Sequence, residues 1–366
     1  MESISEKHVL KGKNQIRFII ILSLSTLALS LFSMGFGSSS QLDMFSTMKI
    51  IFDFEQYSCL KEWFVPFGAE TSFPCNGDYQ SQIVWELRFP RILMGMTAGV
   101  ALATAGALMQ GCLGNPLVSP LTLGVASGAA LGAALAIVLN FSIISIPELA
   151  IVANAFLFSL IVVAIIIQLG NMRSITAESY ILVGIAITFI TGAIVSTMQY
   201  FATDAQLSQL AHWSFGSLSR PDLLDSLGIT LAIIWLIPRS IRWSWDLNTL
   251  SLSGDEFAIS TGVDPVTTRR NILIISALMT SIVIAFTGLI GFVGLAAPHM
   301  SRLLIGNDYR KLIPCSAVFG ALLVVFADTL GRTLFAPIVI PVGIMLSVIG
   351  GPFFMYLLLN NRGRAH

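Results

Sequence analysis

Two acidic residues beside a membrane-length apolar run are the first candidates for chemistry in this sequence. Asp255 and Glu256 lie in the polar segment Leu252 to Val263, and an uncharged run from Asn271 to Pro298 follows the pair Arg269-Arg270. Carboxylates at the base of a span can contact a soluble partner that pushes on the membrane helices. Most charged loops, however, are merely solvated. The segment therefore predicts either a partner contact or an ordinary solvated loop.

A second candidate is the pair Asp328 and Arg332, which are four residues apart and therefore share one helix face. Ionisable groups at mid-membrane would indicate proton or ion coupling, as in secondary transporters. This sequence nearly lacks such groups, and the pair lies towards the outer end of its predicted span. A local ion pair or an outside docking surface is the better interpretation.

The residues needed for an enzyme or a metal centre are not arranged in a recognisable pattern. The sequence has no Walker loop, HExxH or GxSxG motif, and its four histidines are far apart. Cys59 and Cys75 share one polar loop, where they either form a disulfide in an oxidising compartment or remain free thiols. We predict that the chain is not an enzyme and binds no metal or cofactor itself.

Composition places the chain in the membrane. Its 366 residues are 55% hydrophobic and only 11% charged, whereas an ordinary soluble protein is about 25% charged. The mean hydropathy is +0.82. The formal net charge is zero, so bulk electrostatics gives no reason to expect a nucleic-acid partner. The sequence predicts an all-α polytopic membrane protein.

About ten spans are long and apolar enough to cross the hydrocarbon, which needs about 20 residues per helix. They are 17–37, 91–112, 117–139, 149–170, 179–201, 224–241, 272–291, 293–306, 312–332 and 338–359. The eighth is short and continues from the seventh, so nine spans are also defensible. With ten spans, 14 of the 20 Lys and Arg residues fall inside and six outside. This bias supports ten spans with both termini cytoplasmic.

These spans form one membrane domain over residues 1–366, because no repeat or linker divides the chain. The domain has a cytoplasmic tail at 1–16, a long outside loop at 38–87 and a cytoplasmic segment at 248–268. Gly124 and Gly128 lie four apart, a spacing that lets helices approach closely. These glycines are explained equally well as helix-packing positions and as residues that line a path between the helices. In the turn from Gln110 to Pro120, Asn115 is better explained as a structural cap than as a substrate ligand.

Several motifs, in order from Arg88 to the C-terminus, resemble those of FecCD-type permeases. These proteins are the membrane subunits of ABC importers for iron-siderophores, haem and cobalamin. The matching runs are Arg88-Phe-Pro-Arg91, Asn115-Pro-Leu117 with Pro120, Leu123-Gly-Val-Ala-Ser-Gly-Ala129, Trp213 with Gly216-Ser-Leu218, Ser253-Gly-Asp-Glu-Phe-Ala-Ile-Ser-Thr-Gly-Val263, Gly288-Leu-Ile-Gly-Phe-Val-Gly-Leu-Ala-Ala-Pro-His-Met-Ser-Arg302, Ala327-Asp328 with Arg332, and Pro341-Val-Gly-Ile344 with Gly351-Pro-Phe-Phe354. The chain departs from the family pattern at Ser253, Thr261 and Tyr309.

The resemblance implies the type II permease fold of ABC importers, with ten helices per subunit and two subunits enclosing one path. It implies that an elbow fits a groove in an ATPase and comprises Gly254, Asp255, Glu256, Ala258 and Gly262. It also implies that Arg88, Arg91 and Arg332 face outside and pair with acidic residues of a binding protein; snorkelling at the interface is the rival interpretation. The remaining family signature and packing positions are Asn115, Pro116, Gly124, Gly128, Gly294, Pro298, His299, Arg302, Pro341 and Gly343.

The expected function is that of a permease subunit moving a ferric siderophore across the bacterial inner membrane. Haem or cobalamin is the alternative cargo, and a secondary transporter is the alternative class. The expected partners are two copies of an ABC ATPase, which uses ATP and Mg, a periplasmic or lipoprotein substrate-binding protein, and a second permease subunit, identical or related. No nucleic acid is expected.

Overall fold

The computed structural model describes residues 4–36, 44–52, 79–172 and 177–360. This part of the chain is helical and contains no strand. Its elements are α1 (Ile4–Gly35), α2 (Met44–Phe52), α4 (Tyr79–Gln82), the π-helix η2 (Ile83–Arg88), α5 (Phe89–Cys112), α6 (Val125–Val138), α7 (Pro147–Met172), α8 (Ala177–Phe201), α9 (Asp204–Ser214), α10 (Leu223–Arg242), α11 (Ser244–Ser260), α12 (Pro265–Thr287), α13 (Val293–Ile305), α14 (Tyr309–Thr333) and α15 (Val342–Asn360). Cys59 and Cys75 lie outside the described residues.

Each of the ten predicted spans contains a helix, which confirms the all-α polytopic fold. Seven helical stretches are long and apolar enough to cross a membrane alone, and α6 and the first part of α15 are shorter apolar helices. The remaining helix, α13, has 13 residues. It is separated from α12 by a break in which Gly288 and Phe292 both have positive φ. The predicted spans at 272–291 and 293–306 are therefore two helices.

The third span begins later than the sequence predicts. We expected it from residue 117, but α6 starts at Val125. Pro116 and Pro120 cannot donate backbone hydrogen bonds, and Gly124 adopts φ +84° at the N-cap of the helix. Residues 113–124 form irregular turns instead. Val118 and Leu123 in this stretch are buried, as irregular backbone at membrane depth requires.

Several spans begin at residues that cap exposed backbone amides. Asp222 caps α10 in a capping box, and Asp264 caps α12 immediately before Pro265 at the first helical position. Asp308 accepts a hydrogen bond from the backbone amide of Arg310 and so caps α14. A side-chain acceptor satisfies a donor that the helix itself leaves open. These three aspartates fix the ends of helices that position the sites described below.

Helix α5 is the central element of the bundle. It packs against α10, α12, α13 and α14. In the most apolar part of the continuous helical stretch Gln80–Cys112, 83% of the residues are buried. Small residues allow this packing. A Cβ atom at Gly106 would overlap the carbonyl oxygen of Gly294 in α13, and one at Gly99 would overlap the backbone of Gly320 and Ala321 in α14. Close backbone approach substitutes for hydrophobic drive between helices in lipid.

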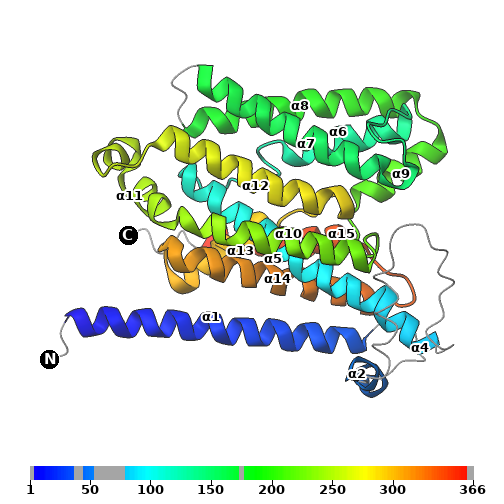
Figure 1. The fold of residues 1–366 in the computed structure, drawn as a ribbon, viewed down its shortest axis with the longest axis horizontal. Coiled ribbons are helices and arrows are strands. Elements are labelled where there is room, and N and C mark those ends of the chain that lie inside the picture. Colours follow the sequence, from blue (N-terminus) through cyan, green and yellow to red (C-terminus); the bar gives the residue numbers. More distant parts are fainter. Residues whose placement is uncertain (1–3, 37–43, 53–78, 173–176, 361–366) are drawn as a thin grey trace.

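The outer helices are arranged on both sides of this centre (Figure 1). Helix α1 packs along α14, and α6 packs against α7 and α8. Among the seven described stretches that are long enough to cross a membrane alone, α8 is the least enclosed by the rest of the bundle. The short helices mark the two ends of the bundle. We call the end that carries α11 the α11 end, and the opposite end, near α4 and α9, the α9 end.

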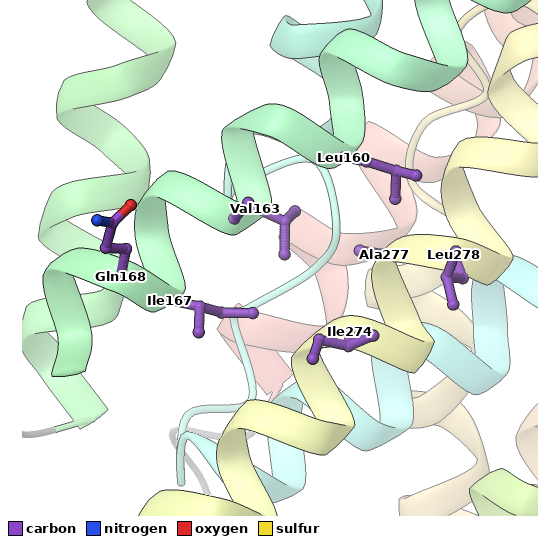
Figure 2. A pocket seen from close by; sticks show the side chains of 8 residues that line it. Leu160, Val163, Ile167, Gln168, Ile274, Ala277 and Leu278 are labelled. Atoms are coloured by element: carbon purple, nitrogen blue, oxygen red, sulfur yellow. The ribbon is translucent and has the colours of Figure 1, made fainter.

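An apolar groove lies between two of the spans, α7 and α12 (Figure 2). Its volume is about 410 Å³. The lining residues are Leu160, Val163, Ala164, Ile167, Gln168, Ile274, Ala277 and Leu278. None of these residues is ionisable, so the groove offers no charged group with which to bind a chelate or an ion.

Candidate functional site

At the α11 end, the geometry of α11 follows from two glycines. Gly254 adopts φ +80° inside the helix, and Gly262 adopts φ +86° just after it. Positive φ is readily available only to glycine. The amide of Gly262 donates to Ile259, and that of Val263 donates to Ala258. This pair of bonds is the Schellman motif, which stops a helix sharply. The predicted segment at 248–268 is therefore most of α11, a tight turn and the start of α12.

The surface of α11 divides the five predicted coupling residues into two groups. Ala258 is fully buried. Gly254, Glu256 and Gly262 are exposed. Their apolar neighbours Phe257 and Ile259 are exposed too, to 40% and 63%. A carboxylate flanked by exposed large apolar side chains is suited to contact another protein.

Asp255, the fifth predicted coupling residue, is bound within this chain. Its two carboxylate oxygens accept bonds of 2.7 and 2.5 Å from the Nη1 and Nη2 atoms of Arg269 in α12. The side chain of Arg269 is only 8% exposed, whereas that of Asp255 is 45% exposed. The Nε atom of Arg269 also donates to the carbonyl oxygen of Cys112, at 2.8 Å. One guanidinium therefore joins α11, α12 and the last residue of α5.

A second polar connection holds the first half of α11. The amide nitrogen of Asn248 donates to Asp308 at 3.0 Å, and its oxygen accepts from the backbone of Tyr309 at 2.9 Å. Arg310 binds the same carboxylate through both Nε and Nη2. These Arg310 bonds, followed by the bond from Asn248, lower the pKa of Asp308 to about 2. Asp308 is therefore ionised at neutral pH and holds α11 against the start of α14.

The predicted signature residue Arg302 connects α13 with the same end of α5. Its guanidinium donates to Gln110 at 3.2 Å and to the Tyr309 hydroxyl at 3.4 Å. Gln110 in turn donates to the carbonyl oxygen of Leu295. His299 is half-buried on the same helix, and Pro298 is buried. The last turn of α5 is thus bonded to both α12 and α13.

At the α9 end, the three arginines predicted for docking cluster around the C-terminal ends of α1 and α14. Arg91 makes bonds of 2.9 and 2.8 Å to Asp328 through Nε and Nη2. Arg332 binds the other oxygen of Asp328 at 3.0 Å. The predicted local ion pair between Asp328 and Arg332 is therefore present, and Arg91 makes it a triad. Arg91 also donates to Ser219.

Burial changes the interpretation of these arginines. Arg88 and Arg332 are 5% and 4% exposed, so neither lies open on the surface as we expected. Arg332 donates to the carbonyl oxygens of Ser33 and Phe36 at the end of α1. Arg88 donates to the carbonyl oxygen of Met34, while its Nη2 atom is buried and has no hydrogen-bond partner among the residues that the structure describes. The three side chains hold α1, α5 and α14 together, and contact with a binding protein remains a prediction.

The other signature residues have packing or capping contacts in the structure. Asn115 accepts a bond from the amide of Leu117 and so caps its own turn; Pro116 follows it and is exposed. A Cβ at Gly128 would meet the backbone of Phe158 and Ser159, and one at Gly343 would meet the carbonyl oxygens of Phe215 and Leu289. Pro341 directly precedes α15. A Cβ at Gly124 would meet Val162 and Gly184.

Sequence reasoning did not single out Arg269, Asn248 or the role of Gln110. Their partners are 14, 60 and 192 residues away along the chain, so spacing alone does not reveal them. One signal was available for Arg269. It stands beside Arg270 at the start of an otherwise uncharged run, and adjacent side chains on a helix point about 100° apart, so one of the two arginines can face inward while the other faces outward. Among the described residues, no three His, Cys, Asp or Glu side chains form a group that could hold a metal.

Comparisons with known proteins place these motifs in a family. Residues 24–360 match the model of the FecCD transport family. The haemin transport permease HmuU of Yersinia pestis is 40% identical over 283 residues, which cover 76% of this chain and 84% of the relative. The vitamin B12 import permease BtuC of Vibrio cholerae is 35% identical over 302 residues, which cover 82% of this chain and 87% of the relative.

The fold matches as well. A solved structure described as an inward-facing ABC transporter of the metal-chelate type has a TM-score of 0.77 and 27% sequence identity. The match covers 94% of this chain and 99% of that chain. The family match spans the ion-pair triad at one end of the bundle and all of α11 at the other. The chain therefore belongs to the FecCD transport family and is an ABC importer permease.

Proposed function

We propose that this chain is the permease subunit of an ATP-driven importer that carries a ferric siderophore across the bacterial inner membrane. The single observation that carries this proposal is the construction of α11. Gly254 has a positive φ within the helix, Glu256, Phe257 and Ile259 are exposed on its surface, and Arg269 bonds it to the membrane helices. The element thus has a free face for a partner and a fixed attachment to the spans.

The partner on that face is an ABC ATPase, present in two copies and supplying the ATP and Mg chemistry. ATP binding draws the two ATPases together and displaces α11 in each permease subunit. The helices then alternate between outward-open and inward-open arrangements, because the two ATPase states favour different packings of the same bundle. Neither nucleotide nor metal has to bind to the permease itself.

The opposite end of the bundle is the outside face in this proposal, and both termini lie in the cytoplasm. A periplasmic or lipoprotein binding protein docks there near Arg88, Arg91 and Arg332. Of these, Arg91 has the most access, with 11% of its side chain exposed. A carboxylate from the binding protein competes with Asp328 for the Arg91 guanidinium. A second permease subunit, identical or related, completes the path.

The cargo is a ferric siderophore, which is a metal chelate, and the similarity to a metal-chelate transporter structure supports this choice. Haem or cobalamin is the second candidate, favoured by the identities of 40% and 35% to HmuU and BtuC. A secondary transporter would need an ionisable relay inside the spans. The buried triad of Arg91, Asp328 and Arg332 lies at one end of the bundle and does not provide one.

The cargo is tested by uptake in cells with and without this gene. The probes are iron-labelled hydroxamate, catecholate and carboxylate siderophores, haem and labelled cobalamin. We expect the deletion to abolish uptake of one ferric siderophore and to leave the other probes unchanged, with recovery when the gene is restored on a plasmid. Loss of haem or cobalamin uptake alone would contradict the siderophore assignment while leaving the ABC class intact.

A further inference from the structure

Three helices meet at Arg269, and its guanidinium is their common polar contact. Nη1 and Nη2 bind both oxygens of Asp255 in α11, while Nε donates to the carbonyl oxygen of Cys112 at the end of α5. The arginine itself belongs to the second turn of α12. A planar guanidinium offers donors in a fixed fork. Its two bonding directions therefore set the position of Asp255 relative to the end of α5.

The surroundings make this contact stiffer than an ordinary surface ion pair. Arg269 is 7% exposed as a residue, and a buried charge is retained only where it is paired and hydrogen-bonded. A lysine would offer a single ammonium on a flexible stem and would not reproduce the fork. The neighbouring Arg270 has the same charge but is exposed. The two adjacent arginines thus provide a buried link and a matched surface control.

Helix α5 is the element best placed to receive a displacement from α11. It is the central helix of the bundle and packs against α10, α12, α13 and α14. Its first turn carries Arg91, which binds Asp328 in α14, and its last residue is Cys112. Helix α5 is one continuous helix of 24 residues, and at about 1.5 Å per residue it connects the two ends of the bundle. A displacement of Cys112 can therefore be transmitted along α5 to Arg91 and the triad that it forms with Asp328 and Arg332.

We propose that Arg269 is the positioning residue through which movement of α11 reaches α5. This inference rests on the proposed function, because it assumes that an ATPase displaces α11. The ion pair with Asp255 fixes the guanidinium to α11, and the bond to Cys112 passes the movement to the central helix. The two contacts act together: the ion pair attaches α11 to the guanidinium, and the Nε bond ties that guanidinium to the end of α5. They add to the direct packing of α11 on α5 and to the bonds of Asn248 with the start of α14.

The test uses the full complex, with permease, ATPase and binding protein, reconstituted in liposomes and supplied with an iron-labelled siderophore that the wild type transports. Arg269→Gln and Asp255→Asn are compared with the control Arg270→Gln. Three quantities are measured for each: co-purification of the ATPase, the rate of ATP hydrolysis, and uptake per ATP hydrolysed. Asp255→Asn keeps the bond to Cys112, and its half-exposed position keeps the test usable if Arg269→Gln does not fold.

We expect co-purification and hydrolysis to persist in both variants, because the exposed Glu256, Phe257 and Ile259 are untouched and the Asp255 carboxylate is bonded to Arg269 within this chain. Uptake per ATP falls at least about fivefold, the lower end of typical coupling effects between sites, while Arg270→Gln matches the wild type. A residue with a merely structural role would lower the amount of complex and leave the ratio unchanged. An unchanged ratio in both Arg269→Gln and Asp255→Asn overturns the inference.

A charge exchange separates the two contacts of Arg269. The double variant Asp255→Arg with Arg269→Asp can restore an ion pair between α11 and α12, but an aspartate cannot donate to the carbonyl oxygen of Cys112. We expect uptake per ATP to stay low in this variant, and full recovery would overturn the role of α5. If the wild-type complex itself showed no ATP-dependent uptake, the proposed function would fail instead, so the two failures are distinguishable.

Discussion

Asp255 accepts two hydrogen bonds from one guanidinium, whereas Asp328 accepts three from Arg91 and a fourth from Arg332. The two carboxylates also differ in burial, and therefore in how much each contributes to stability. The side chain of Asp328 is 3% exposed and serves both Arg91 and Arg332, whereas that of Asp255 is 45% exposed. Exposed ion pairs contribute about 0 to 1 kcal/mol to stability. Removing one partner of a buried pair costs about 3 to 5 kcal/mol, because it leaves a buried charge uncompensated. Asp328 therefore contributes mainly to the stability of the fold, whereas Asp255 contributes little to stability and has the coupling role proposed above.

The variant Asp328→Asn should accordingly lower the thermal stability of the purified permease. It keeps the shape of the side chain but leaves the buried Arg332 and the mostly buried Arg91 without an anion, at a cost of about 3 kcal/mol or more. The measurement is the melting temperature in detergent. Asp204→Asn, at the exposed start of α9, is the control and should cost less than about 1 kcal/mol. Equal melting temperatures for Asp328→Asn and the wild type would refute this account of the triad.

At this scale the sequence predicts near neighbours better than distant ones. The spacing of Asp328 and Arg332 was enough to predict their pairing, because residues four apart on a helix are adjacent. Arg91 is 237 residues from Asp328, and only the packing of α5 on α14 brings them together. The burial of Arg88 and Arg332 was not predicted, for the same reason. Helix α1 covers both guanidiniums, and no local pattern indicates where α1 lies.

Among the helices, the contact between α5 and α13 depends on two small residues. A Cβ atom at Gly106 would overlap the carbonyl oxygen of Gly294. We expect Gly106→Ala to force the two helices apart and to destabilise the permease by about 1 to 3 kcal/mol, the usual cost of overpacking. Gly192→Ala is the matched control, because a Cβ there meets no atom within 4 Å. Thermal unfolding of both variants in detergent tests this, and an equal response would contradict the packing argument.

Hydropathy predicts the spans well because lipid requires each crossing segment to satisfy its own backbone hydrogen bonds. It fails where protein rather than lipid surrounds the chain. The start of α6 was predicted at residue 117, but residues 113–124 form turns in which Val118 and Leu123 are buried against neighbouring helices while Pro116 and Leu117 are exposed. Composition does not distinguish these two environments. The starts of α10 at Leu223 and α14 at Tyr309 lie closer to the predicted residues 224 and 312, and aspartates cap both helices, whereas α12 begins at Pro265 instead of residue 272.

For the molecule as a whole, the two ends of the bundle are mechanically connected through α5. The arginine triad holds α1, α5 and α14 at one end, and Arg269 and Arg302 bond α5 to α12 and α13 at the other. The sequence places the motifs of both ends in order, but it does not show that one helix joins them. A connection of this kind suits a subunit that must respond at one face to an event at the other.

The measurement that tests this account most directly is accumulation of iron-labelled siderophores in liposomes containing the complete complex, with and without ATP and Mg on the ATPase side. We predict accumulation only with ATP. We also predict that Glu256→Lys reduces it to background, while Glu178→Lys, the same charge change at the exposed start of α8, leaves it unchanged. Accumulation driven by an ion gradient without ATP, or normal ATP-driven uptake by Glu256→Lys, would contradict the central claim that α11 couples an ATPase to this permease.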